Sequence, residues 1–162
     1  NLLDFLNDKN FRIVHILGDT LDPKFNNKKN KNYIPIAFTN EIAALMQNCD
    51  LVISRAGSGA INEIIKTKSP SILIPYPNAK NNHQEKNALI LSSIGCSIII
   101  QQNKNLEINL KENLQRIFKM ESNNSKNQYK ILEIMKKNIS EFNLKDPRQE
   151  IKKIINYLTK NL

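Results

Sequence analysis

Two glycines separated by one serine mark the stretch of this sequence that is best suited to hold an anion. Residues 50–54 begin it as a short apolar, β-branched run typical of a buried strand. The turn Gly57-Ser58-Gly59 follows, and apolar residues then recur at helical spacing: Ala60, Ile61, Ile64 and Ile65. A helix that starts directly after such a turn directs backbone N–H groups and its positive end at a phosphate, and a Cβ at either glycine would hinder the approach. From these residues alone, an ordinary strand–turn–helix unit without a ligand is an equal alternative.

The surrounding elements alternate between strands and helices. We expect strands at 11–17, 33–38, 50–54, 71–74 and 97–101, and helices at 1–9, 40–48, 59–68, 83–94, 107–120, 125–138 and 146–160. Thr39 is expected to be the N-cap of the helix over 40–48. This alternation predicts an α/β fold, a Rossmann-like parallel sheet flanked by helices, as a single domain over 1–162 whose body spans about 1–143. Ligands of such sheets bind beyond the carboxyl ends of the strands. The connections after Leu17, Phe38, Ser54 and Pro75 should therefore share one edge.

Composition and charge limit the function classes. The chain has 162 residues, is 40% hydrophobic and 24% charged, and carries a net charge of +9. The basic residues are spread over several segments and form no zinc-finger, RNA-recognition or basic-zipper pattern, so we expect no nucleic-acid partner. No apolar run approaches the roughly 18 residues of a membrane span. Cys49 and Cys96 are expected to be small buried hydrophobes, not a disulfide or a metal site, and we expect no bound metal.

Several motifs in order resemble one enzyme family. They are Ser54-Arg55-Ala56-Gly57-Ser58-Gly59-Ala60, Glu63, Pro70, Pro75-Tyr76-Pro77, His83-Gln84 and Asn87-Ala88. Together they resemble the MurG-type glycosyltransferases, which transfer N-acetylglucosamine from UDP-N-acetylglucosamine to lipid I and so form lipid II in peptidoglycan synthesis. The resemblance covers about residues 10–120, and we expect it to continue to the end of the chain. It implies the C-terminal, donor-binding half of a GT-B hexosyltransferase that needs no cofactor and lies peripherally on the cytoplasmic face of the bacterial inner membrane, in contact with anionic lipid.

The resemblance also implies roles for individual residues. The turn Gly57-Ser58-Gly59 would face the diphosphate, Glu63 would accept hydrogen bonds from the ribose hydroxyls, and Phe38 with Thr39 would meet the uracil. His83 and Gln84 would contact the sugar, and Arg55 would help to neutralise phosphate.

Each of these roles has a structural alternative that the sequence leaves open. Phe38 could belong to the core and Glu63 could pair with Lys66. His83 and Gln84 could be ordinary helix-start residues, and Arg55 could pair with a carboxylate. His15, within a strand pattern, is a weaker candidate for the same edge and is expected to be structural.

The family resemblance leaves one half of the enzyme unaccounted for. Family members carry a glycine-rich loop in the N-terminal domain and a second, Gly-Gly-Ser-type loop that opens the C-terminal domain, and neither has a counterpart in this sequence. The N-terminal domain, which binds lipid I, is therefore expected to be absent, and the catalytic residues are unknown. We therefore expect a chain that binds the donor but is inactive alone. Because the sequence starts inside a helix without Met, a fragment is favoured over a natural UDP-sugar-binding subunit of a two-chain transferase, as in the eukaryotic dolichol pathway.

Overall fold

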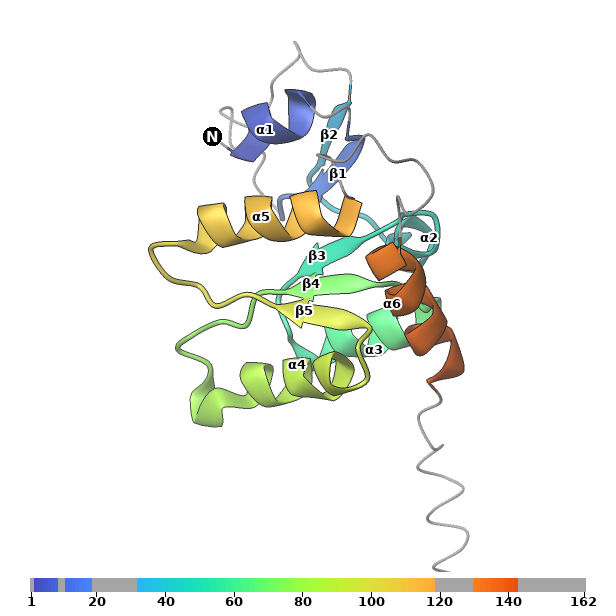
Figure 1. The fold of residues 1–162 in the computed structure, drawn as a ribbon, viewed down its shortest axis with the longest axis vertical. Coiled ribbons are helices and arrows are strands. Elements are labelled where there is room, and N and C mark those ends of the chain that lie inside the picture. The colour runs from blue at the N-terminus through green and yellow to red at the C-terminus, as the bar shows by residue number, and fades with distance from the viewer. Residues whose placement is uncertain (1, 9–10, 19–31, 119–129, 143–162) are drawn as a thin grey trace, which may run out of the picture.

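The computed structural model of the protein describes residues 2–8, 11–18, 32–118 and 130–142 (Figure 1). Strands and helices alternate along these ranges, as the sequence predicts. The strands are β1 (Ile13–Ile16), β2 (Tyr33–Ile36), β3 (Val52–Ser54), β4 (Ser71–Leu73) and β5 (Ser97–Ile99). The helices are α1 (Leu2–Asp8), α2 (Ile42–Gln47), α3 (Ser58–Thr67), α4 (His83–Ser93), α5 (Leu106–Phe118) and α6 (Lys130–Glu141), with the short 3-10 helix η2 (Lys80–Asn82) before α4.

All strand pairs within the described ranges are parallel. β1 pairs with β2, and β3, β4 and β5 pair in that order, so the strands form two parallel sheets and not one continuous ladder. Pro35 lies opposite His15 on β2, and because the smaller sheet has two strands in the described ranges, each strand has an open edge where a residue without an N–H can be accommodated. The predicted α/β architecture with parallel strands is confirmed, whereas the prediction of a single sheet is wrong, because across the described residues β1 and β2 pair with each other and not with β3–β5.

Helices cover both faces of the larger sheet. Side chains alternate between faces along a strand, so Ile72 and Leu73 of β4 point in opposite directions, and both are fully buried. Leu73 packs with residues of α3 and α4, such as Ile64 and Leu91, whereas Ile72 packs with α1 and α5. Figure 1 shows α3 and α4 on one side of β3–β5 and α1 and α5 on the other. The predicted apolar stripe of α3 is confirmed, since Ile61, Ile64 and Ile65 are all buried.

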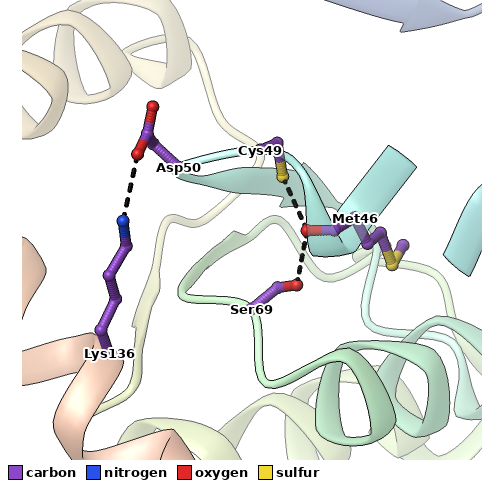
Figure 2. Close-up of polar contacts among 5 residues, drawn as sticks. All are labelled: Met46, Cys49, Asp50, Ser69 and Lys136. Carbon is purple, nitrogen blue, oxygen red and sulfur yellow. Dashed lines mark hydrogen bonds and ion pairs between the residues drawn. The ribbon is translucent and has the colours of Figure 1, made fainter. Parts of the chain in front are cut away.

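The amino ends of the larger sheet's strands are joined to α6 and α2 by polar contacts. Asp50, just before β3, pairs with Lys136 of α6 at 3.0 Å. Ser69, just before β4, donates its hydroxyl to the Met46 carbonyl of α2 at 2.9 Å. The Cys49 thiol donates to the same carbonyl at 3.2 Å, and Figure 2 shows all three contacts. These contacts use the amino edge of the sheet and leave its carboxyl edge available for other roles.

A second pair of contacts holds the far end of α6 to the same edge. Asn138 donates its side-chain amide to the Gly95 carbonyl just before β5 at 3.1 Å. Lys68, in the left-handed conformation that ends α3, donates its ammonium to the Phe142 carbonyl. Together the two contacts fix α6 against the turns that precede β4 and β5.

Two expectations from the sequence are corrected here. Cys96 is buried as predicted, but Cys49 is exposed, because it follows the end of α2 and its thiol turns back to the helix carbonyls. Thr39 does not cap the helix directly: α2 begins at Ile42, and the Thr39 hydroxyl accepts the N–H of Glu41 at 2.9 Å in the turn before it.

The structure describes no residue after 142. The helix predicted at 146–160 lies outside the described residues. Across 2–8, 11–18, 32–118 and 130–142, no helix is long and apolar enough to cross a membrane.

Candidate functional site

The glycine turn joins β3 to α3 at the carboxyl edge of the larger sheet. Gly57 is the N-cap of α3, with φ −66° and ψ 153°, and no side chain caps the helix there. The Gly57 carbonyl accepts the N–H of Ile61 at 3.0 Å, which is the first hydrogen bond of the helix. The N–H groups of the first turn, from Ser58 onward, therefore have no intrahelical acceptor and present the positive end of the helix dipole. Such an end favours an anion.

Neither glycine is required by the fold itself. Gly57 has a φ that any residue adopts, and Gly59 lies within the first turn of α3. A Cβ built on either glycine meets no atom within 4 Å. Because neither backbone strain nor internal packing selects glycine here, the remaining physical advantage is the close approach of a group from outside the chain.

Arg55 connects the glycine turn to the ends of β4 and β5. Its Nη1 donates to the carbonyls of Ile74 at 3.2 Å and Pro75 at 3.5 Å, and to Oε1 of Gln102 at 2.5 Å. Its guanidinium carbon also lies 5.7 Å from the centroid of the Tyr76 ring. The partners of Nη1 are carbonyl and amide oxygens, in place of the carboxylate expected as the alternative to a phosphate. Arg55 thus links three successive strand-end connections.

Helix α4 also contacts the glycine turn and the loop that follows β4. The side-chain amide of Asn87 donates to the Ala56 carbonyl of the glycine turn at 3.1 Å. Oε1 of Gln84 accepts the backbone N–H of Tyr76 at 2.9 Å. Gln84 is therefore not merely an ordinary helix-start residue, since it fixes the loop between β4 and α4.

His83, the first residue of α4, is exposed, and its Nδ1 lies 2.8 Å from the Lys80 carbonyl. A carbonyl can only accept, so Nδ1 carries the proton and Nε2 is left as the second polar atom of the ring. His83 therefore presents an acceptor when the ring is neutral and a donor when it is charged.

Glu63 lies just over one turn into α3, with its side chain 32% exposed. Its Oε1 is 3.5 Å from Nζ of Lys66, which is the pairing expected as the structural alternative. Lys66 is 72% exposed, so this ion pair is a weak surface contact and leaves the carboxylate able to bind hydroxyl groups.

Phe38 follows β2 and is 68% exposed, so the core alternative for this residue is wrong. Thr39, beside it, is tied to the turn before α2 through the N–H of Glu41. Since α2 packs against α3, this segment is connected with the glycine turn through the two helices. An exposed aromatic ring at a strand end is available for stacking on a flat ligand.

His15, the weaker candidate, belongs to the smaller sheet. Its Nδ1 lies 2.8 Å from the Tyr33 hydroxyl, and burial lowers the pKa of the imidazole. These contacts fit the structural role expected from the sequence.

The structure joins some of the sequence candidates and adds residues without a predicted role. Arg55 and Gln84 are both hydrogen-bonded to the loop that follows β4, and Arg55 also reaches Gln102 after β5. Asn87 donates to the carbonyl of Ala56, the residue before Gly57. The sequence does place Gln102 directly after a strand, where the carboxyl-edge rule could have indicated it. Across the described ranges, no three His, Cys, Asp or Glu side chains gather as metal ligands would.

The chain is similar to proteins of one glycosyltransferase family. Residues 2–144 match the model of the glycosyltransferase family 28 C-terminal domain. The chain is 58% identical over 158 residues to a UDP-N-acetylglucosamine--N-acetylmuramyl-(pentapeptide) pyrophosphoryl-undecaprenol N-acetylglucosamine transferase of Prochlorococcus marinus (strain MIT 9312), covering 98% of this chain and 44% of the relative. A relative of the same description from strain MIT 9211 is 36% identical over 145 residues, with 90% of this chain and 40% of the relative covered. The chain thus spans less than half the length of these relatives.

Solved structures share the fold. MurG of Acinetobacter baumannii superposes with a TM-score of 0.63 at 22% identity, over 80% of this chain and 36% of that one. Spinosyn forosaminyltransferase SpnP superposes with a TM-score of 0.57 at 13% identity, over 86% of this chain and 33% of that one. At these identities the likeness concerns the arrangement of strands and helices.

Proposed function

This chain belongs to the glycosyltransferase family 28 C-terminal domain family, and from that membership we propose that it is the UDP-N-acetylglucosamine-binding part of an inverting transferase that converts lipid I to lipid II. Its fold is that of the C-terminal half of a GT-B glycosyltransferase. The observation that carries the proposal is the uncapped start of α3, with two glycines that no internal contact requires. Helix starts of this kind bind anions, and the diphosphate of a nucleotide sugar is such a group.

In the proposed complex the donor lies along the carboxyl edge of the larger sheet. The N–H groups of Ser58 and Gly59 bind the diphosphate, and the Glu63 carboxylate accepts hydrogen bonds from the two ribose hydroxyls. The exposed ring of Phe38 and the backbone beside Thr39 meet the uracil. These roles agree with the exposure of Phe38 and with the weak pairing of Glu63.

The sugar would lie toward the start of α4. His83 offers Nε2 there, and Gln84 keeps its amide nitrogen after Oε1 has accepted the Tyr76 N–H. Arg55 would contribute positive charge near the phosphates while it holds the strand-end connections together.

The reaction we propose is a single displacement at the anomeric carbon. The 4-hydroxyl of the muramyl sugar attacks the anomeric carbon, its proton passes to a general base, and the bond to the diphosphate oxygen breaks with inversion. The charge that develops on the departing UDP is stabilised by the helix N–H groups, which are already oriented before the reaction. This assigns charge stabilisation to residues of this chain and proton transfer to residues outside it.

The acceptor lipid would be bound, and the general base supplied, in this proposal, by an N-terminal domain outside these 162 residues. The complete enzyme would act at the cytoplasmic face of the bacterial inner membrane, where a chain with a net charge of +9 would be attracted to anionic lipid. The 162-residue chain should therefore bind the donor and fail to transfer the sugar.

Calorimetric titration of the 162-residue chain tests the proposal. We expect UDP-N-acetylglucosamine and UDP to bind and raise the melting temperature, while ADP-glucose and a short RNA produce no saturable heat. Binding of RNA that weakens steeply with salt, without binding of UDP-sugar, would favour a nucleic-acid module instead. Transfer of N-acetylglucosamine to lipid I by this chain alone would contradict its dependence on a second domain.

A further inference from the structure

The glycine turn is held in place by α4 through one side-chain amide. Nδ2 of the half-buried Asn87 donates to the Ala56 carbonyl at 3.1 Å, across 31 positions of sequence. Ala56 and Ala88 on either side of this contact are fully buried, so the turn and α4 pack tightly here. The proposed donor contacts give Asn87 no role, and its Nδ2 is already hydrogen-bonded to the Ala56 carbonyl.

The direction of the turn's N–H groups follows from that contact. A peptide unit is planar, and in its trans form the C=O and the N–H point in opposite directions. Because the Ala56 carbonyl is drawn toward Asn87, the Gly57 N–H in the same plane points away from α4. The next peptide is fixed in the same way, since the Gly57 carbonyl accepts the N–H of Ile61 at 3.0 Å. The N–H groups of Gly57 and Ser58 therefore point in the direction opposite to the Ala56 and Gly57 carbonyls, which are hydrogen-bonded within the chain.

We propose that Asn87 is a positioning residue, whose amide orients the Ala56–Gly57 peptide so that the Gly57 N–H joins those of α3 in binding the donor diphosphate. This inference rests on the proposed function and adds to it the residue that keeps the diphosphate site in shape before the donor arrives. Pre-orientation matters because a peptide that must rotate on binding loses affinity.

The chain offers a matched control for this role. Asn138 also donates its side-chain amide to the carbonyl of a turn, that of Gly95, at the same distance of 3.1 Å. That contact lies at the amino edge of the sheet. Replacing either asparagine by alanine removes a hydrogen bond of the same type and length. The bond of Asn138 is exposed whereas that of Asn87 is partly buried, so Asn138→Ala should lose less stability, and only Asn87→Ala should affect the donor site.

The test compares Asn87→Ala, Asn87→Asp and Asn138→Ala in calorimetric titrations of the 162-residue chain with UDP-N-acetylglucosamine, UDP and uridine. We expect Asn87→Ala to raise the Kd of UDP and of UDP-N-acetylglucosamine by the same factor, about tenfold, with no change for uridine. Asn87→Asp, which keeps the shape but cannot donate to a carbonyl, should lose at least as much. Asn138→Ala should bind all three like the unaltered chain.

The outcomes separate the two proposals. If the unaltered chain does not bind UDP, the proposed function fails. If it binds UDP and Asn87→Ala binds equally well, or loses uridine in proportion, the positioning role fails and Asn87 is only structural. Should the Asn87 variants not fold, amide NMR of the unaltered chain decides: UDP should shift the Gly57 resonance and uridine should not, and an unchanged Gly57 resonance would overturn the inference.

Discussion

The replacement Glu63→Ala distinguishes the proposed contact between Glu63 and the ribose from the ion pair that Glu63 makes with Lys66. The Glu63 side chain is 32% exposed and its ion-pair partner Lys66 is 72% exposed. A surface pair three residues apart on a helix contributes only about 0.3–0.5 kcal/mol. Its loss should lower the melting temperature by about 1–2 °C in a chain of this size.

The expected effect of the same change on binding is much larger. A carboxylate that accepts hydrogen bonds from two ribose hydroxyls contributes about 1.5–3 kcal/mol for each bond in a dry site. Because Glu63 is about a third exposed, we take about 2–3 kcal/mol for both together. Glu63→Ala should therefore raise the Kd of UDP-N-acetylglucosamine by about 30- to 150-fold.

Calorimetric titration and thermal unfolding of the same preparations measure both quantities. Lys66→Ala is the matched control, since it breaks the same ion pair and leaves the carboxylate in place. It should reproduce the small loss of stability and retain donor affinity. The reasoning is refuted if Glu63→Ala binds the donor like the unaltered chain, or if Lys66→Ala weakens binding to the same extent.

Three other changes probe the turn, the opposite edge and the thiols. Gly59→Ala should raise the free energy of unfolding by about 0.5–1 kcal/mol, because alanine favours the helix and its Cβ meets open space. The same change should weaken UDP binding about tenfold. An unchanged UDP affinity in calorimetry would remove the reason given for glycine at this position. Gly95→Ala should lower the free energy of unfolding by at least about 1 kcal/mol in urea titrations, because Gly95 has φ +70° and a Cβ would lie 2.7 Å from the Asn138 amide. The variant should keep its affinity for UDP. Loss of UDP affinity would mean that the amino and carboxyl edges of the larger sheet are not independent. At pH 8 a thiol reagent should modify the exposed Cys49 faster than Cys96, which should react only on unfolding. Burial and Asp50 raise the pKa of Cys49, so its reaction should be slower than that of a free thiol, and burial raises the pKa of Cys96 to about 11. Two equally fast thiols would contradict the burial of Cys96.

The fold could be predicted from local pattern because the larger sheet is buried on both faces. Apolar runs such as 71–74 and the stripe Ile61, Ile64 and Ile65 leave few alternatives to strands and an amphipathic helix. The exposure of Cys49 could not be predicted in this way. Its spacing continues the apolar face of α2, but the helix ends two residues earlier and the chain turns.

The candidate site was predictable only where its residues are close in sequence. The strand, glycine turn and helix start are local features, and the structure has them as expected. The partners of Arg55 and Asn87 are 19 to 47 positions away, so no spacing rule could indicate them before the strands were placed side by side. The exposure of Phe38 is likewise a property of the assembled sheet edge, which the apolar character of the residue conceals.

A crystal structure of the 162-residue chain with bound UDP-N-acetylglucosamine tests the central claim most directly, because the claim concerns where the diphosphate binds. We predict that phosphate oxygens lie within hydrogen-bond distance of the backbone N–H groups of Ser58 and Gly59, with the ribose hydroxyls donating to Glu63. A donor bound elsewhere on the chain, with the start of α3 in contact with water only, would contradict the account.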